Sequence, residues 1–314
     1  MSKPDSPRSR RRAIWVLLQA AVIVIALGYI AWGLYRGWGQ LRQHSWTLRP
    51  GLALLSLAAA IGWFLCRAWL WQRILISLGF PLPYRRVYRA WILSELARFL
   101  PGKIWYAVSR SYLSEQDGVP PPVALTGMAV ELAVVTLAAL AFFPLRAEAA
   151  APLLRGPIFA AVIAVAVAVL VQPRPLLRLV SVLARRITSV RGGSAPSLAP
   201  ESLDAAFGWR TRLEMLALSA AMWVCLAGGF LLLACSMSRL SWSDALAVSS
   251  SFPVAWVVAM AAVISPAGLG VRESVLAALL AGVLPGGVGV VVALASRLWV
   301  TLAELLCAAA AWRR

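Results

Sequence analysis

The chain of 314 residues is 61% hydrophobic and 13% charged, with a mean hydropathy of +0.80. Soluble globular chains average about 25% charged residues, so this composition excludes a soluble protein. A net charge of +18 would suggest nucleic acid on a soluble fold, but here the basic residues lie mainly between apolar runs. That placement is typical of loop charges that orient a membrane protein and contact anionic headgroups. We therefore expect an all-helical polytopic membrane protein.

The first part of the chain predicts a basic tail and then a membrane half. Residues 1–12 carry five basic side chains, and we place this tail in the cytoplasm. The first membrane half extends over residues 13–172. A span requires about 20 apolar residues. The runs assigned as spanning helices are 13–35, 51–71, 121–145 and 156–173.

The longest loop separates two halves. Residues 174–212 carry seven basic residues against two acids, which predicts a cytoplasmic segment over 173–212. Within it, residues 176–190 have an amphipathic pattern, and residues 192–200 form a linker rich in Gly, Ser and Pro. The second membrane half is 213–314, with spanning helices at 215–238 and 287–312, so about six full spans are expected in total.

Two apolar segments contain helix-breaking residues. Residues 87–113 are broken near Pro101, and residues 245–284 are broken near Pro266. We expect each to be a re-entrant helical hairpin, because broken backbone at membrane depth is tolerated only inside protein or beside a cavity. Two alternatives remain: the first segment could be a pair of interfacial helices, and the uncharged run 245–271 could span once.

The order of helix, broken hairpin and helix recurs. Pro101 and Pro266 are 165 residues apart, and the same offset carries the second and third helices onto the last two. With the charge rule, this spacing predicts that the two halves are inverted repeats, an arrangement that places a substrate site between half-helices near the midplane.

Positive side chains lie beside both breaks. A half-helix that begins at Lys103 or Arg272 would direct free N–H groups and a positive dipole end into the protein. With Arg98 these residues predict a site for a lipid phosphate. For Arg110 the competing interpretation is a side chain that extends to the headgroups.

Three charges interrupt otherwise apolar helices: Glu131, Arg297 and Glu304. An ionisable residue at membrane depth is costly unless it is paired or hydrated, so its default interpretation is functional. The 165-residue offset carries Glu131 next to Arg297, which predicts that these two meet between the halves. The alternatives are that Arg297 pairs with Glu304 on its own helix face, or that the charges only tie the halves together.

The hinges resemble those of a known family. Residues 94–110 (SELARFLPGKIWYAVSR) and 266–273 (PAGLGVRE), followed by Arg297 and Glu304, are similar to the transmembrane domain of lysylphosphatidylglycerol synthetases and of stand-alone flippase-like relatives. The likeness covers about residues 51–312. The chain stops at Arg314, so we do not expect the aminoacyl-transferase activity of the full-length synthetases.

The resemblance implies an inner-membrane protein that moves a lipid between leaflets. The lipid would be an anionic or aminoacylated phospholipid, a polyprenyl lipid or another glycolipid. The candidate headgroup-binding residues at the two hinges are Arg98, Pro101, Gly102, Lys103, Arg110, Pro266, Gly268, Gly270, Arg272 and Glu273.

The side chains that the sequence offers argue against an enzyme. The sole histidine, His44, lies in a short loop, the loop after the first span has no acid, and no metal site is visible, so we expect no cofactor. The expected partners are membrane lipids and no nucleic acid, with a second copy or a lipid-modifying enzyme left open. The alternative function is a membrane scaffold that binds lipid without moving it.

The charge distribution makes a testable prediction about topology. Both termini and the loop 174–212 should lie in the cytoplasm, because basic residues concentrate there. Single cysteines near Arg191 and Arg313, in a variant without the four native cysteines, should react with an impermeant reagent only after the membrane is opened. Labelling of either position from the periplasm of intact cells would contradict the inverted arrangement.

Overall fold

A computed structural model describes residues 24, 28–44, 46, 48–99, 104–146, 207–261 and 270–312. These residues form helices joined by turns, with no strand among them. Residues 28–36 are helical, in agreement with the end of the expected first span. The rest of that span, the expected helix 156–173, the amphipathic segment 176–190 and the linker 192–200 lie outside the described residues.

Five of the described helices are long and apolar enough to cross a bilayer. Four coincide with expected spans, and α12 is an additional candidate in the segment where we expected a hairpin arm. Their bounds are α3 (Pro50–Ser77), α6 (Pro121–Leu140), α11 (Trp209–Met237), α12 (Trp242–Ala261) and α14 (Gly286–Trp312). The protein is therefore a multi-pass helical membrane protein.

The remaining helices are too short to span alone. They are α2 (Trp38–Gln43), α4 (Tyr84–Leu96), η1 (Ala97–Phe99), α5 (Ile104–Gln116), η2 (Pro144–Arg146) and α13 (Val271–Leu280). α4 and α5 have 13 residues each and pack against each other, and the break between them falls on residues 100–103, outside the described part. Two arms of this length fit the expected first hairpin. In the second segment the arms are unequal, because α12 has 20 residues and α13 has 10.

The helix bounds repeat at the expected offset. Adding 165 to the bounds of α3, α4, α5 and α6 gives 215–242, 249–261, 269–281 and 286–305. These ranges overlap α11, α12, α13 and α14 in order. The two halves therefore share one sequence of elements in the described part of the chain.

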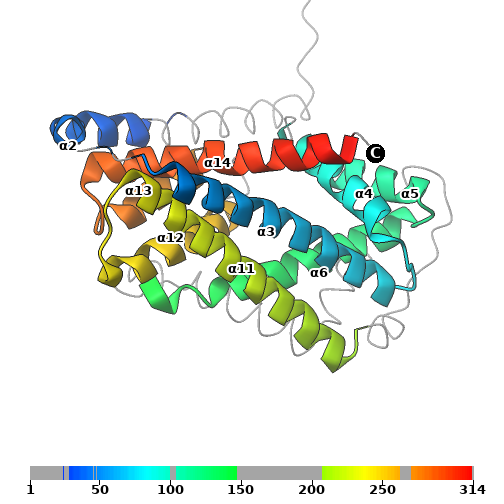
Figure 1. Cartoon of the computed structure of the whole chain (residues 1–314). Coiled ribbons are helices and arrows are strands. Elements are labelled where there is room, and N and C mark those ends of the chain that lie inside the picture. Colours follow the sequence, from blue (N-terminus) through cyan, green and yellow to red (C-terminus); the bar gives the residue numbers. More distant parts are fainter. Residues whose placement is uncertain are drawn as a thin grey trace, which may run out of the picture.

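The central pair of the repeat, α3 and α11, is antiparallel (Figure 1). Near the start of α3, the Arg49 N–H donates to the Ser236 carbonyl at 3.0 Å. Towards its end, Arg73 Nη2 lies 2.7 Å from Glu214 Oε2. Partner numbers in α11 fall as those in α3 rise, so equivalent helices of the two halves run in opposite directions.

The outer pair, α6 and α14, also has opposite directions (Figure 1). α6 begins after α5 and leads to Arg146, which donates to the Leu279 carbonyl of α13. α14 begins beside α13 and ends beside α4, where the Tyr88 hydroxyl donates to the Cys307 carbonyl at 2.8 Å. Both pairs of equivalent helices thus agree with an inverted repeat.

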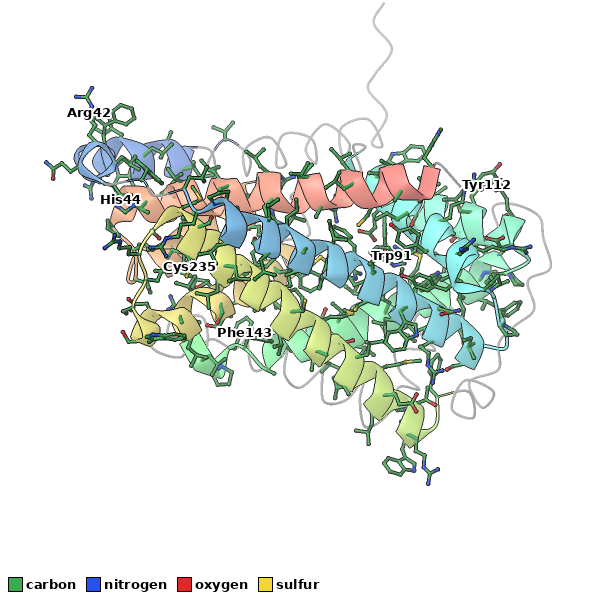
Figure 2. The ribbon with its side chains drawn as sticks, viewed as in Figure 1. Arg42, His44, Trp91, Tyr112, Phe143 and Cys235 are labelled. Atoms are coloured by element: carbon green, nitrogen blue, oxygen red, sulfur yellow. The ribbon has the colours of Figure 1, made fainter. Side chains whose placement is uncertain are left out.

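Aromatic side chains fill the space between the halves. Trp63 of α3 contacts Trp223 of α11, and Trp223 contacts Trp256 of α12, with ring centroids 6.2 and 5.2 Å apart. Trp91 of α4 points into the bundle, whereas Tyr112 of α5 lies at its outer edge (Figure 2). This core holds the two short helices against the long ones.

Two adjacent glycines in α11 test the α3–α11 contact. A Cβ atom at Gly229 would lie 2.9 Å from the Ala59 Cβ and 3.1 Å from Trp299 Cζ2, whereas one at Gly228 would have no neighbour within 4 Å. Gly229→Ala should lower the free energy of unfolding by about 1–3 kcal/mol through overpacking. Gly228→Ala brings the same gain in helix propensity as Gly229→Ala, and it should not lower the free energy of unfolding. Thermal unfolding in detergent micelles measures both, and equal behaviour of the two variants would contradict the close packing.

Candidate functional site

Among the described residues, more charged side chains are buried than the three that the sequence singled out. Glu131 and Glu304 are buried as expected, and Arg297 is partly buried. The other buried charged residues are Arg67, Glu95, Arg110, Arg146 and Glu273. Because an isolated charge is very costly in an apolar medium, their pairing determines the structure of the site.

Glu131 of α6 lies at the centre of one cluster. Its Oε1 accepts hydrogen bonds from Arg67 Nη2 at 2.6 Å and from Trp91 Nε1 at 3.2 Å. Its Oε2 accepts one from Arg110 Nη1 at 2.6 Å. One carboxylate therefore links α3, α4, α5 and α6.

Arg110 of α5 is fully buried and bonded through all three of its nitrogens. Besides Glu131, it donates from Nε to Ser94 Oγ at 2.9 Å and from Nη2 to Glu95 Oε1 at 2.7 Å. Three rings also surround its guanidinium, with centroids 4.5 to 5.2 Å from Cζ: Tyr106, Trp91 and Trp71. The interpretation that Arg110 extends to the headgroups is wrong, because its donors are used inside the bundle.

Arg98 connects this cluster to the second half. Its Nη1 lies 3.1 Å from Glu95 Oε2, and its Nη2 forms an ion pair with Glu304 Oε2 on α14. The charges Arg67, Arg98 and Arg110 balance Glu95, Glu131 and Glu304, so this first cluster is formally neutral. An ion pair does join the halves, but it is formed by Arg98 and Glu304, a pair that the sequence did not predict.

A second cluster surrounds Glu273 at the start of α13. Its Oε1 lies 3.1 Å from both Arg272 Nη2 and Arg297 Nη1. Its Oε2 accepts the Gly270 N–H at 2.9 Å, in a turn where Gly270 has a φ of +79°. The carboxylate therefore occupies part of the helix N-terminus that we expected to be open. Two arginines against one glutamate leave this second cluster with a charge of +1.

The predicted contact between Glu131 and Arg297 is wrong. Glu131 is paired with Arg67 and Arg110 of its own half, and Arg297 is paired with Glu273. Equivalent positions in the repeat carry different residues, since Glu131 corresponds to Ser296, and the ion pair that does join the halves is formed by Arg98 and Glu304. Arg297 and Glu304 do not form an ion pair either.

Both clusters line one cavity of about 440 Å³. Its charged wall contains Arg67, Glu95, Arg98, Glu131, Arg272 and Arg297. Its apolar wall comes from α5, α6, α12 and α14 and includes Leu125, Met128, Leu132, Trp256, Met260 and Val300. The cavity therefore lies between the halves, and its lining combines charged and apolar side chains.

The sequence profile of the Lysylphosphatidylglycerol synthase TM region matches residues 17–307 of the chain. The chain belongs to this family. The match extends through both clusters and all five candidate spans, so the cavity is part of the family's membrane region. No curated protein matches the chain.

The structure describes only some of the predicted site residues. It places Arg98 and Arg272 on the cavity wall, with Gly270 and Glu273 beside Arg272 and Arg110 behind Glu131. Pro101, Gly102, Lys103, Pro266 and Gly268 lie outside the described residues. Among the described residues, no group of three or more His, Cys, Asp or Glu side chains could hold a metal ion.

Sequence reasoning missed the roles of two residues. No site role was predicted for Arg67, but this side chain is buried beside Glu131 and between the Trp63 and Trp91 rings, with both centroids 5.0 Å from Cζ. Glu95 looked like one charge of an interfacial helix. The signal for Arg67 was present, because it interrupts a 28-residue apolar helix well before its end.

The first cluster predicts strong coupling between Arg110 and Glu131. Glu131→Gln removes the carboxylate that Arg67 and Arg110 share, and Arg110→Gln leaves Glu95 and Glu131 one buried cation short, so each should cost about 3–5 kcal/mol of unfolding free energy. The double variant should lose less than the sum. Effects of Glu131→Gln and Arg297→Gln should instead be additive, because the two residues belong to different clusters.

The matched control for this cycle is the surface pair Arg73 and Glu214, which also joins α3 to another helix. Arg73→Gln should cost less than about 1 kcal/mol. Unfolding in mixed micelles measures all variants. Additive effects of Arg110→Gln and Glu131→Gln would contradict the pairing.

Proposed function

We propose that the protein is a flippase that moves an anionic or aminoacylated phospholipid, or a polyprenyl or other glycolipid, across the inner membrane. The observation that carries the proposal is the cavity between the two halves, which combines an excess positive charge with an apolar wall. A headgroup would enter the charged side while the acyl chains follow the apolar side. The membership in a family of lipid-synthase membrane regions supports a lipid as the ligand.

The headgroup phosphate would bind at the second cluster. Among the residues that the structure describes, Arg272 and Arg297 both donate to the shared Glu273, and the Arg272 Nε has no hydrogen-bond partner. Guanidinium groups with unused donors suit a phosphodiester. Arg98 would assist from the opposite wall, whereas Arg110 would position Glu95 and Glu131.

The other predicted contributions remain part of the proposal. Pro101, Gly102 and Lys103 at the first hinge, and Pro266 and Gly268 at the second, would shape re-entrant hairpins that close around the headgroup. The protein would work without catalysis or cofactor, with both termini in the cytoplasm, and its partners would be lipids.

One observation favours a second candidate function. The buried ion pair between Arg98 and Glu304 joins the two halves, and a permanent tie would suit a scaffold that binds lipid without moving it. Movement and binding must therefore be measured separately.

The test uses purified full-length protein in liposomes that contain fluorescent phosphatidylglycerol. The wild type should make the inner-leaflet label accessible to an impermeant quencher. Arg272→Ala and Arg297→Ala should each weaken lipid binding about tenfold or more, since one charge-assisted hydrogen bond contributes roughly 1.5–3 kcal/mol.

The control is Arg73→Ala, which removes an exposed arginine from α3 and should leave binding and movement unchanged. Binding without movement by the wild type would support the scaffold. Unchanged binding and movement in both cavity variants would contradict the headgroup site.

A further inference from the structure

Glu304 differs from the other carboxylates at the cavity. It is fully buried in α14, and its Oε2 is paired with Arg98. Its Oε1 is also buried but has no hydrogen-bond partner in the part of the chain that the structure describes. The three remaining buried carboxylates have partners on both oxygens: Glu95, Glu131 and Glu273. Glu304 is therefore the carboxylate with the weakest compensation for its charge.

The groups around Glu304 allow it to lose that charge. Arg98 on η1 and Glu95 on α4 lie closest, Arg297 and Cys307 are on its own helix, and Tyr88 of α4 bonds the Cys307 carbonyl. If Glu304 becomes neutral, Arg98 retains its ion pair with Glu95. No arginine of the first cluster would then lack a carboxylate.

We propose that Glu304 is a proton-binding site that couples proton uptake to the binding of an anionic lipid in the cavity. This inference rests on the proposed lipid transport. Thr301 lines the cavity one helical turn before Glu304, and Arg98 lines it as well, so water in the cavity lies close to the carboxylate. A hydronium ion that enters the cavity transfers its proton to Oε1 and leaves as water, and the carboxylate becomes a neutral acid.

Protonation changes the cavity in two ways. The formal charge of the two clusters rises from +1 to +2, which favours an anionic headgroup. The buried ion pair between Arg98 and Glu304 is lost, which releases a tie between the halves. By thermodynamic linkage, a lipid that binds better to the protonated form must itself promote proton uptake.

The first experiment measures the proton directly by infrared difference spectroscopy of the purified protein against pH. The wild type should show a carboxylic-acid band that appears as pH falls and grows when short-chain phosphatidylglycerol is added. Glu304→Gln should remove this band, and Glu304→Asp should shift it. The control, Glu214→Gln, changes an exposed glutamate of α11 and should leave the band unchanged.

The second experiment measures lipid movement in liposomes with equal pH on both sides. On the steep side of a single-site titration the protonated fraction changes roughly tenfold per pH unit, so the wild-type rate should depend strongly on pH. The rate of Glu304→Gln should be the same at pH 5 and pH 8. A proton gradient should drive net movement in the wild type but not in this variant.

The outcomes separate the two proposals. Lipid movement without pH dependence, or a pH dependence that Glu304→Gln retains, would overturn the proton site and leave the flippase proposal standing. If Glu304→Gln fails to fold, an unshifted band in Glu304→Asp overturns the proton site. If the wild type moves no lipid, both proposals fail, even if the band is present.

Discussion

The structure depends on the requirement that charges inside an apolar bundle be compensated by other charges. Five arginines and four glutamates from seven elements lie at or beside one cavity, and each glutamate is paired with at least one arginine. Helices α4 and α5 are too short to span, and their positions are fixed by Glu95 and Arg110, which bond each other, and by the bond from Arg110 to Glu131. A polar cluster that is fully bonded specifies one arrangement of its elements, because any displacement leaves a buried charge alone.

The two clusters differ in how completely their buried charges are neutralised. Around Glu131 the charges balance and Arg110 has no unused nitrogen, which suits a structural role. Around Glu273 one carboxylate serves two arginines that face the cavity, which suits an incoming anion. Arg98 and Glu304 join the two halves, and Glu304 Oε1 has no hydrogen-bond partner among the described residues. A coupled transporter requires three parts. Here they are the rigid wall around Glu131, the positive wall around Glu273 and the weakly compensated pair of Arg98 and Glu304.

Much of the fold could be predicted from hydropathy and spacing. The apolar runs located four of the five long described helices, and the 165-residue offset between Pro101 and Pro266 anticipated the repeat of elements. The sequence left open whether the segment of α12 spans, because 20 apolar residues before a Pro/Gly break have the same composition in a span and in a hairpin arm. The importance of Glu131, Arg297 and Glu304 could be predicted because each interrupts an apolar helix.

The pairing of those charges could not be predicted. The rotation and tilt of each helix decide which charged residues pair. A 165-residue offset does not determine rotation and tilt to within the length of one hydrogen bond. Glu131 was expected to meet Arg297, but the nearest cations come from α3 and α5. Glu95 was hidden because it lies among other charged residues in sequence, and only the fold separates it from the surface, whereas Arg67 interrupts an apolar helix and carried a signal that was overlooked. Arg110, beside a predicted hinge, looked like a ligand but is enclosed by three rings.

The central claim is that the charge around Arg272 and Arg297 binds a lipid phosphate inside the protein. The most direct measurement is the structure of the protein in a phosphatidylglycerol nanodisc. We predict a phosphate within hydrogen-bond distance of both guanidinium groups, with the acyl chains along the apolar wall formed by α6 and α12. A cavity occupied only by water, with every lipid phosphate at the outer rim of the helices, would contradict the claim.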